Sequence, residues 1–75
     1  MRQDLLELLN EICPGIDFET ETALIDDGIL DSLDIITIVQ NLLLTFGVEI
    51  DVEDLEAENF NSLDAICAFV ESKMD

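Results

Sequence analysis

The sequence predicts an all-α protein, folded as a small bundle of three main helices and one short helix. Three segments repeat apolar residues at the 3- and 4-residue spacing of an amphipathic helix, and residues that cap or end helices separate them. Each apolar stripe has to be covered by the other helices, which favours a four-helix bundle. The 75 residues contain no internal repeat, linker or low-complexity stretch, so a single domain over residues 1–75 is expected.

The first helix is expected from about Gln3 to Cys13 and ends at Pro14-Gly15. Its apolar residues share the helical spacing: Leu5, Leu8, Leu9 and Ile12. The stretch from Ile16 to Asp31 that follows has no helical period and is long for a connection. It has to be anchored to the core, because it contains side chains too apolar to lie in water: Phe18, Leu24, Ile29 and Leu30. Long loops of this kind are often functional.

The second helix is expected from about Ser32 to Phe46, with Asp31 as its N-cap and Gly47 at its end. Asp31 and Asp34 have the spacing of a capping box, in which an aspartate replaces the usual glutamate. The β-branched run Ile35 to Val39 favours a strand. We nevertheless predict a helix, because the apolar segment continues beyond this run and is too long for a typical strand.

The C-terminal third contains a short helical turn and the last helix. Val48-Glu49-Ile50 is a short alternating segment, and Asp51 to Leu55 is expected to form one turn. The last helix begins near Asn61 or Ser62, either of which can cap it, and runs to the C-terminus. Its apolar stripe consists of Leu63, Ile66, Cys67, Val70 and Met74.

The charge of the chain is strongly acidic. Nineteen Asp and Glu residues face two basic residues, Arg2 and Lys73, for a net charge of −17. Nucleic acid binding is excluded because no cationic surface exists to neutralise phosphates, and an anionic membrane surface would repel the chain. A basic protein partner, attracted over a long range, is the natural counterpart. The alternative is that the charge only keeps an apolar-rich small protein soluble.

No signal peptide is expected, because acidic residues follow Arg2 at once. The longest uncharged run, Ile35 to Val48, is 14 residues, too short to insert across a membrane. Cys13 and Cys67 both fall on apolar helical faces and are expected to be buried free thiols. These features indicate a reducing, cytoplasmic location, and a monomer is expected.

Ser32 lies at the start of the second helix, in Asp31-Ser32-Leu33-Asp34. The free N–H groups and the positive dipole end of a helix favour a phosphate attached there. The chain has no histidine, and its one lysine is close to the C-terminus, so the usual bases that activate a serine nucleophile are missing. Plain helix capping alone would explain a serine between two aspartates.

The chain as a whole resembles acyl carrier proteins over essentially its full length. The helix spacing and Phe46 match this family. Three segments match as well: Asp26-Asp27-Gly28-Ile29-Leu30-Asp31-Ser32-Leu33-Asp34, Val48-Glu49-Ile50 and Ser62-Leu63-Asp64-Ala65-Ile66. The resemblance implies that Ser32 carries 4′-phosphopantetheine from coenzyme A, whose thiol holds an acyl or aminoacyl group as a thioester. It implies a carrier rather than an enzyme, modified by a phosphopantetheinyl transferase and used by acyl- or aminoacyl-loading ligases or transferases and downstream synthases.

The second helix departs from the acyl carrier proteins of fatty acid biosynthesis, which carry several glutamates there. Residues 35–46 have no ionisable side chain, which favours a dedicated pathway. Helical geometry predicts a core stripe of Ile36, Val39, Leu42 and Phe46, and a second face of Leu33, Thr37, Gln40 and Leu44. The additional leucines either enlarge the core or form an apolar docking face. The residues expected to bind partners are Asp31, Leu33, Asp34, Leu44, Glu53, Asp54 and Glu56.

Two alternatives concern the cargo and the class of protein. The segment Glu58-Asn59-Phe60-Asn61-Ser62 has some likeness to D-alanyl carrier proteins and to peptidyl carriers. The competing class is a non-carrier acidic module that recruits a basic protein.

A dedicated metal site is not expected. An EF-hand would need oxygen ligands at Ala23 and Ile25, where the chain has none. Diffuse binding of divalent cations is expected around the acidic residues of this region: Asp26, Asp27, Asp31 and Asp34.

Overall fold

The computed structural model describes residues 2–74, and over this range the chain is helical and has no strand. The helices are α1 (Arg2–Ile12), α2 (Ser32–Phe46), α3 (Ala57–Phe60) and α4 (Leu63–Met74), with a 3-10 turn, η1 (Val52–Asp54), before α3. This arrangement confirms the predicted all-α class. The turn expected from Asp51 to Leu55 is η1, whereas α3 is an additional helix that the sequence did not predict.

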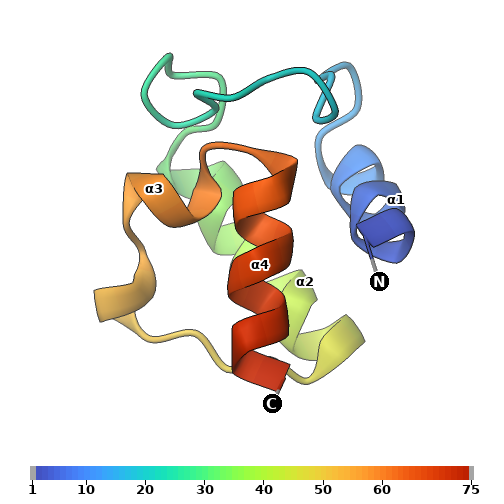
Figure 1. The fold of residues 1–75 in the computed structure, drawn as a ribbon, viewed down its shortest axis with the longest axis vertical. Coiled ribbons are helices and arrows are strands. Elements are labelled where there is room, and N and C mark those ends of the chain that lie inside the picture. Colours follow the sequence, from blue (N-terminus) through green and yellow to red (C-terminus); the bar gives the residue numbers. More distant parts are fainter. Residues whose placement is uncertain (1, 75) are drawn as a thin grey trace.

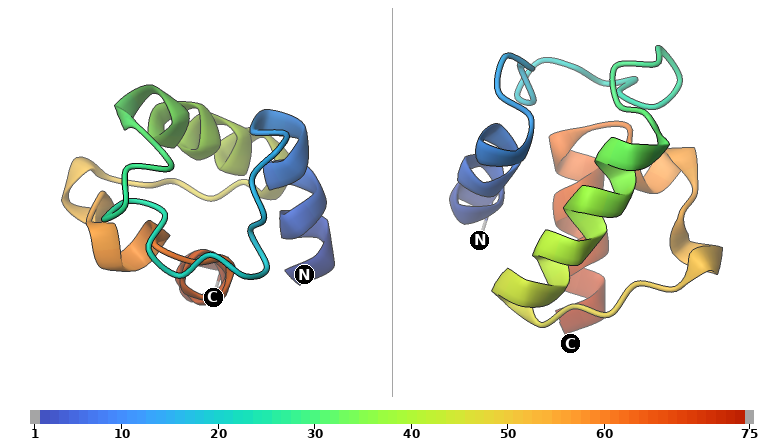
Figure 2. Two further views of the ribbon diagram at one scale, coloured as in Figure 1. Left: turned by 90° about the horizontal axis from the view of Figure 1, so that it is seen from above. Right: turned by 180° about the vertical axis from the view of Figure 1, so that it is seen from behind.

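The three long helices lie side by side, with α1 running opposite to α2 and α4 (Figure 1). α1 contacts both α2 and α4, and the short α3 contacts α4. The connection from α1 to α2 crosses the end of the bundle at which α2 and α4 begin, as the two further views show (Figure 2). The start of α2 is therefore placed directly after this crossing segment.

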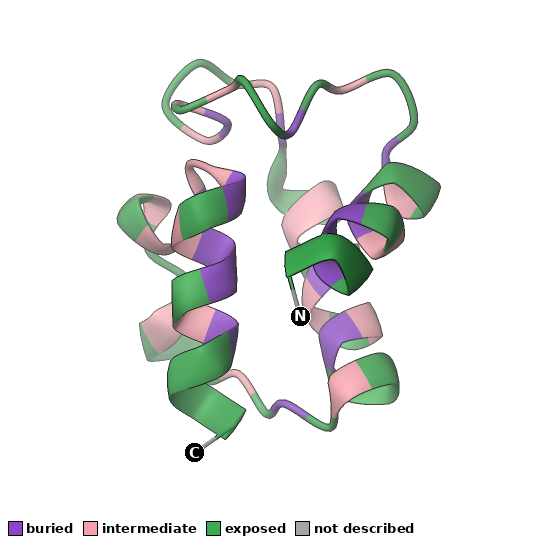
Figure 3. Cartoon of the chain, turned by 45° about the vertical axis from the view of Figure 1, so that its right-hand side comes forward, coloured by how far each residue is buried: buried purple, intermediate pink, exposed green. Residues whose placement is uncertain are grey.

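Every buried residue in the described part of the chain is apolar. The buried side of each long helix faces the interior of the bundle (Figure 3). Residues 16–31 of the connection contribute three core residues, Phe18, Leu24 and Leu30, as expected from their apolar character, and Ile29 is partly buried against the core. Cys13, directly after α1, is also buried, and the helices and the segment after α2 contribute the others: Leu5, Leu6, Leu9, Ile38, Leu42, Val48, Phe60, Leu63, Ile66, Cys67 and Val70. Both cysteines are buried free thiols, which confirms that prediction.

The predicted core stripe of α2 is wrong in part. Ile38 and Leu42 are fully buried, whereas Val39 and Phe46 are half-buried and Ile36 is 50% exposed. Two residues along a helix correspond to a rotation of about 200°, so Ile36 lies on a different side from Ile38. Apolar residues occur almost all around this helix, and the packing of α1 selects which side is covered.

The apolar stripes of α1 and α4 also differ from the prediction at single positions. Leu8 and Ile12 are only half-buried, and Leu6 is buried in addition. Met74, on the predicted stripe of α4, is 51% exposed. The last helix is expected to run to the C-terminus, but the last residue, Asp75, lies outside the described residues.

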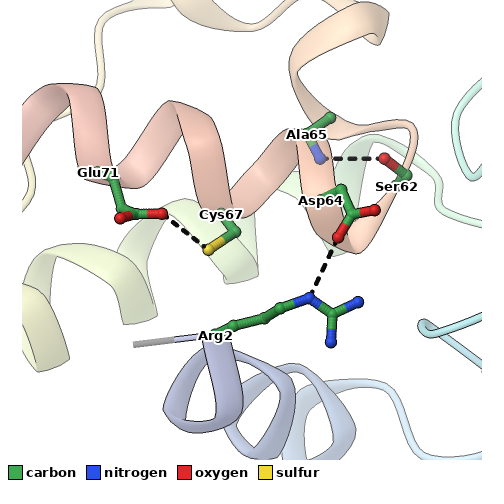
Figure 4. Close-up of polar contacts among 6 residues, drawn as sticks. All are labelled: Arg2, Ser62, Asp64, Ala65, Cys67 and Glu71. Atoms are coloured by element: carbon green, nitrogen blue, oxygen red, sulfur yellow. Dashed lines mark hydrogen bonds and ion pairs between the residues drawn. The ribbon is translucent and has the colours of Figure 1, made fainter.

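The ends of the long helices follow the predicted capping chemistry. Gly47 ends α2 in the left-handed conformation at φ 70°, and its N–H points to the carbonyl oxygens of Leu42 and Leu43. Ser62 caps α4, since its Oγ accepts a hydrogen bond from the Ala65 N–H at 3.0 Å (Figure 4). Asn61, the other candidate for this cap, binds elsewhere.

The two basic side chains both form ion pairs within the molecule. Arg2 Nε lies 3.1 Å from Asp64 Oδ1 and joins the starts of α1 and α4 (Figure 4). Lys73 Nζ lies 2.8 Å from Asp54 Oδ2, and 5.7 Å from the centre of the Phe69 ring. The second pair therefore fastens η1 to the last turn of α4, although pairs that stay in contact with water contribute little stability.

We predict that the Lys73–Asp54 pair stabilises the fold only between two pH limits. The hydrogen bond from Lys73 holds the pKa of Asp54 below its ordinary value of 3.8, so this stability is lost as the pH falls through the lowered value. The same bond raises the pKa of Lys73 above 10.5, so the stability is also lost as the pH rises through the raised value. Lys73→Gln should therefore melt a few degrees below the wild type at neutral pH.

The measurement is thermal unfolding by circular dichroism at pH 2.5, 7 and 11. Asp54→Asn and the double variant complete a double-mutant cycle, which separates the coupling between Lys73 and Asp54 from the effect of Lys73 on the other carboxylates. The coupling between the two positions should be largest at pH 7 and smaller at pH 2.5 and pH 11. A coupling that is equal at all three pH values would show that the ion pair is not its source.

Candidate functional site

Ser32 is the first residue of α2 and is exposed. The backbone around it is fixed by reciprocal hydrogen bonds, since the Asp34 N–H donates to Asp31 Oδ1 at 2.9 Å and the Asp31 N–H donates to Asp34 Oδ2 at 3.3 Å. The Ile35 N–H donates to the Asp31 carbonyl at 3.0 Å and begins the helical ladder. The predicted capping box is confirmed, and it is complete without the hydroxyl of Ser32.

The surroundings of Ser32 suit a modification site better than a nucleophilic one. Among residues 2–74, no hydrogen bond engages its hydroxyl, and the sequence has no histidine to act as a base. The nearest carboxylates, Asp31 and Asp34, are occupied by the capping box. The amides of Ser32 and Leu33 precede the first intrahelical bond and are available to a phosphate oxygen. The positive end of the helix offsets part of the repulsion from the two aspartates.

A cavity of about 420 Å³ opens next to Ser32. Its lining residues are Ile25, Leu30, Asp31, Ser32, Ile35, Ile36 and Leu55. Apart from Ser32 and Asp31, every lining side chain is apolar. A smaller cavity of about 50 Å³ shares Ile25, Ile35 and Leu55 with the first and is also lined by Glu56, Ala57 and Phe60. An exposed hydroxyl with available amides fits the attachment of a phosphate-linked arm, and the apolar cavity lies beside it.

Asn61 is a site residue that the sequence did not identify beyond its capping potential. Its Oδ1 accepts hydrogen bonds from the Ile25 N–H at 2.9 Å and from the Asp26 N–H at 3.1 Å, and its Nδ2 donates to Asp26 Oδ2 at 3.2 Å. The Asn61 carbonyl also accepts from the Leu24 N–H at 2.9 Å. A cap and a long-range tether require the same residue types, so only the structure distinguishes them.

The leucines predicted to contact partners lie on the outer face of α2. Leu33 is 73% exposed and Leu44 is 83% exposed, so the reading in which Leu44 enlarges the core is wrong. The two residues are separated by three turns, about 16 Å along the helix. Of the two leucines, only Leu33 is next to Ser32 in the sequence, where Asp31 and Asp34 also flank it.

The other acidic residues predicted to contact partners lie in and after η1, and their environments differ. Glu53 and Glu56 are exposed, whereas Asp54 is half-buried and bound to Lys73. The hydrogen bond and the charge of Glu58 raise the pKa of Glu56. Because Lys73 compensates the charge of Asp54 within the molecule, Glu53 and Glu56 are the acids of this segment that are available to a partner.

The two thiols are poor nucleophiles. Burial raises the pKa of Cys13, and the carboxylates of Asp34 and Asp31 raise it further. Burial also raises the pKa of Cys67, whose Sγ donates to Glu71 Oε1 at 3.2 Å (Figure 4). Both thiols stay protonated at neutral pH, so neither is an activated nucleophile.

Two further expectations concern metals and membranes. Within residues 2–74, no group of three or more acidic or cysteine side chains converges on a position for a metal ion. Diffuse divalent binding by the acids near Ser32 stays a prediction. Over the same residues, no helix has the length and apolar character needed to cross a membrane.

The comparisons with known proteins agree with this geometry. Residues 3–70 match the profile of a family described as the phosphopantetheine attachment site. A comparison with curated proteins finds no significant match. Members of the matched family bear covalent 4′-phosphopantetheine, are carriers without catalytic activity of their own, and generally interact with phosphopantetheinyl transferases and with synthases or ligases.

The match covers nearly the whole chain, and the non-carrier alternative is left without support. The chain therefore belongs to the phosphopantetheine attachment-site family, consistent with the acyl carrier proteins, and is a phosphopantetheine-bearing carrier rather than an enzyme.

Proposed function

We propose that Ser32 is the attachment residue and that residues 1–75 form one carrier domain, which presents a thioester-linked group to successive enzymes of a dedicated cytoplasmic pathway. The observation that carries the proposal is the position of Ser32. Its hydroxyl is exposed and unengaged, at the start of a rigidly capped helix and beside the 420 Å³ cavity. The two other serines, Ser62 and Ser72, have hydroxyls that bond the backbone of α4.

The residues around Ser32 position the arm, and they perform no chemistry. When bound, 4′-phosphopantetheine supplies the thiol that holds the cargo. The capping box of Asp31 and Asp34 fixes the backbone that bears the hydroxyl. The amides of the first turn lie where the phosphate is attached.

We propose an apolar acyl cargo in preference to an aminoacyl one. The cavity walls formed by Ile25, Leu30, Ile35, Ile36 and Leu55 bear no charge and have no partner for an ammonium group. The aminoacyl alternative, as in D-alanyl or peptidyl carriers, is supported by the likeness of residues 58–62. Asp31 at the rim of the cavity is the one lining group that would attract an ammonium.

Ser32→Ala should abolish modification without affecting the fold. Incubation with coenzyme A and a phosphopantetheinyl transferase, followed by intact-mass measurement, should add one phosphopantetheine to the wild type and none to the variant. The variant should lose little stability because Asp31 still caps α2.

The matched control for this experiment is Ser62→Ala. It removes the cap of α4 at a cost of about 1 kcal/mol, yet it should be modified like the wild type. Modification of Ser32→Ala, with the label found on another serine, would refute the assignment.

Partner recognition is the second part of the proposal. Leu33 and Leu44 offer apolar contact along α2, Asp31 and Asp34 flank the attachment residue, and Glu53 and Glu56 attract a basic partner from a distance. Asp54 belongs to the same acidic segment, but Lys73 already compensates its charge. We therefore expect replacement of Asp54 to have the smallest effect on association.

Leu44→Glu should weaken binding to the phosphopantetheinyl transferase mainly through faster dissociation. A carboxylate would replace apolar contact, and we expect an increase of about tenfold in the dissociation rate by surface plasmon resonance. The variant should remain folded because Leu44 is exposed. Asn10→Glu, which adds the same charge to the exposed side of α1, is the control. Equal dissociation rates for the two variants would contradict the docking face.

Glu53→Lys/Glu56→Lys should instead slow association, by an amount that shrinks as the salt concentration rises. Glu7→Lys/Glu11→Lys makes the same change in net charge on α1 and serves as the matched control. If both pairs slow association equally, the total charge of the chain is the cause, and the acidic segment after α2 has no special role.

A further inference from the structure

The segment just before Ser32 is a closed turn with no regular secondary structure. The Leu30 N–H donates to the Leu24 carbonyl at 2.9 Å, so the segment returns close to its own start. Inside it, the Asp27 N–H donates to the Ala23 carbonyl at 2.8 Å and the Gly28 N–H donates to the Ile25 carbonyl at 3.0 Å. These bonds are local. They hold the shape of the turn and do not fix its place on the bundle.

Asn61 makes the long-range polar contacts of this turn. Its carbonyl and its carboxamide together bind three successive residues, Leu24, Ile25 and Asp26, through four hydrogen bonds. Asn61 itself stands between two anchored elements, because it ends α3 and directly precedes Ser62, the cap of α4. It therefore connects the turn to a rigid part of the bundle.

The tethered residues form part of the surroundings of Ser32. Ile25 lines both apolar cavities, and Leu30, whose N–H closes the turn, lines the larger one. A shift of the turn would move Ile25 away from Ile35 and Leu55 and would change the wall beside Ser32. The position of this wall thus depends on a side chain that lies 29 positions further along the sequence than Ser32.

The chemistry of the contact selects a carboxamide. The oxygen of Asn61 accepts two backbone N–H groups, while its nitrogen donates to the carboxylate of Asp26. An aspartate could accept the two N–H groups, but it would face Asp26 with a second negative charge. An alanine would leave both backbone donors without their partner.

We infer that Asn61 is a positioning residue of the attachment site, which holds the turn of residues 24–30 against the bundle so that Ser32 is presented beside a formed apolar wall. The inference rests on the proposed attachment at Ser32. Asn61 acts through the turn and does not itself line either cavity.

The test compares Asn61→Ala, Asn61→Asp and the reciprocal variant Asp26→Asn/Asn61→Asp. The rate of modification by a phosphopantetheinyl transferase with coenzyme A should fall about tenfold in both single variants. The reciprocal variant keeps the net charge and lets an amide at position 26 donate to a carboxylate at position 61. It should restore most of the wild-type rate.

Two controls separate positioning from a general loss of stability. Ser62→Ala weakens the adjoining start of α4 but leaves the turn tethered, so it should be modified at the wild-type rate. Hydrogen exchange should accelerate at the amides of Ile25 and Asp26 in the single variants and return toward wild-type rates in the reciprocal variant. The capping-box amide of Asp34 should stay protected in all of them.

The outcomes are distinct. Single variants modified as fast as the wild type, or a reciprocal variant no faster than Asn61→Asp, would overturn the positioning role alone. A wild type that takes up no phosphopantetheine at Ser32 would overturn the attachment proposal and this inference with it. Slow single variants, a restored reciprocal variant and a normal Ser62→Ala would establish the role.

Discussion

Burial of the connection between α1 and α2 is the constraint on which the rest of the structure depends. Phe18, Leu24 and Leu30 are almost fully buried, and side chains of this size each contribute about 2 kcal/mol when removed from water. A core of this small size depends on them, because the long helices alone cover only part of one another. Their burial holds the connection across the end of the bundle, and the connection in turn sets the position in space of the first residues of α2.

The second constraint is the charge. Nearly all of the ionisable side chains are carboxylates, and both basic side chains are used in ion pairs inside the molecule. Among the described residues, no polar or charged residue is buried, so the interior is held together by apolar packing and backbone hydrogen bonds. The carboxylates are left to the surface, where they favour basic partners and disfavour association of the chain with itself. An exposed leucine on α2 can therefore persist in a monomer.

Features set by local sequence were predictable, and features set by distant contacts were not. The bounds of α1 and α2 and the start of α4 follow from caps, from Gly47 and from apolar spacing, and the structure places them within one or two residues of the prediction. The exposure of Ile36 and the role of Asn61 depend on which element packs nearby, and neither spacing nor residue type contains that information. For Leu44, periodicity left two readings open, and its exposure in the folded chain excludes one of them.

A carrier has to hold a thioester without consuming it, and this requirement explains the environment of the cysteines. A thiolate of the protein would attack a thioester carried on the arm, whereas a thiol would not. Burial keeps Cys13 protonated, and the carboxylates of Asp34 and Asp31 add to this effect. The same two aspartates form the capping box that fixes the backbone of Ser32. One pair of side chains therefore fixes the backbone of the proposed attachment residue and adds to the burial that keeps the thiol of Cys13 protonated.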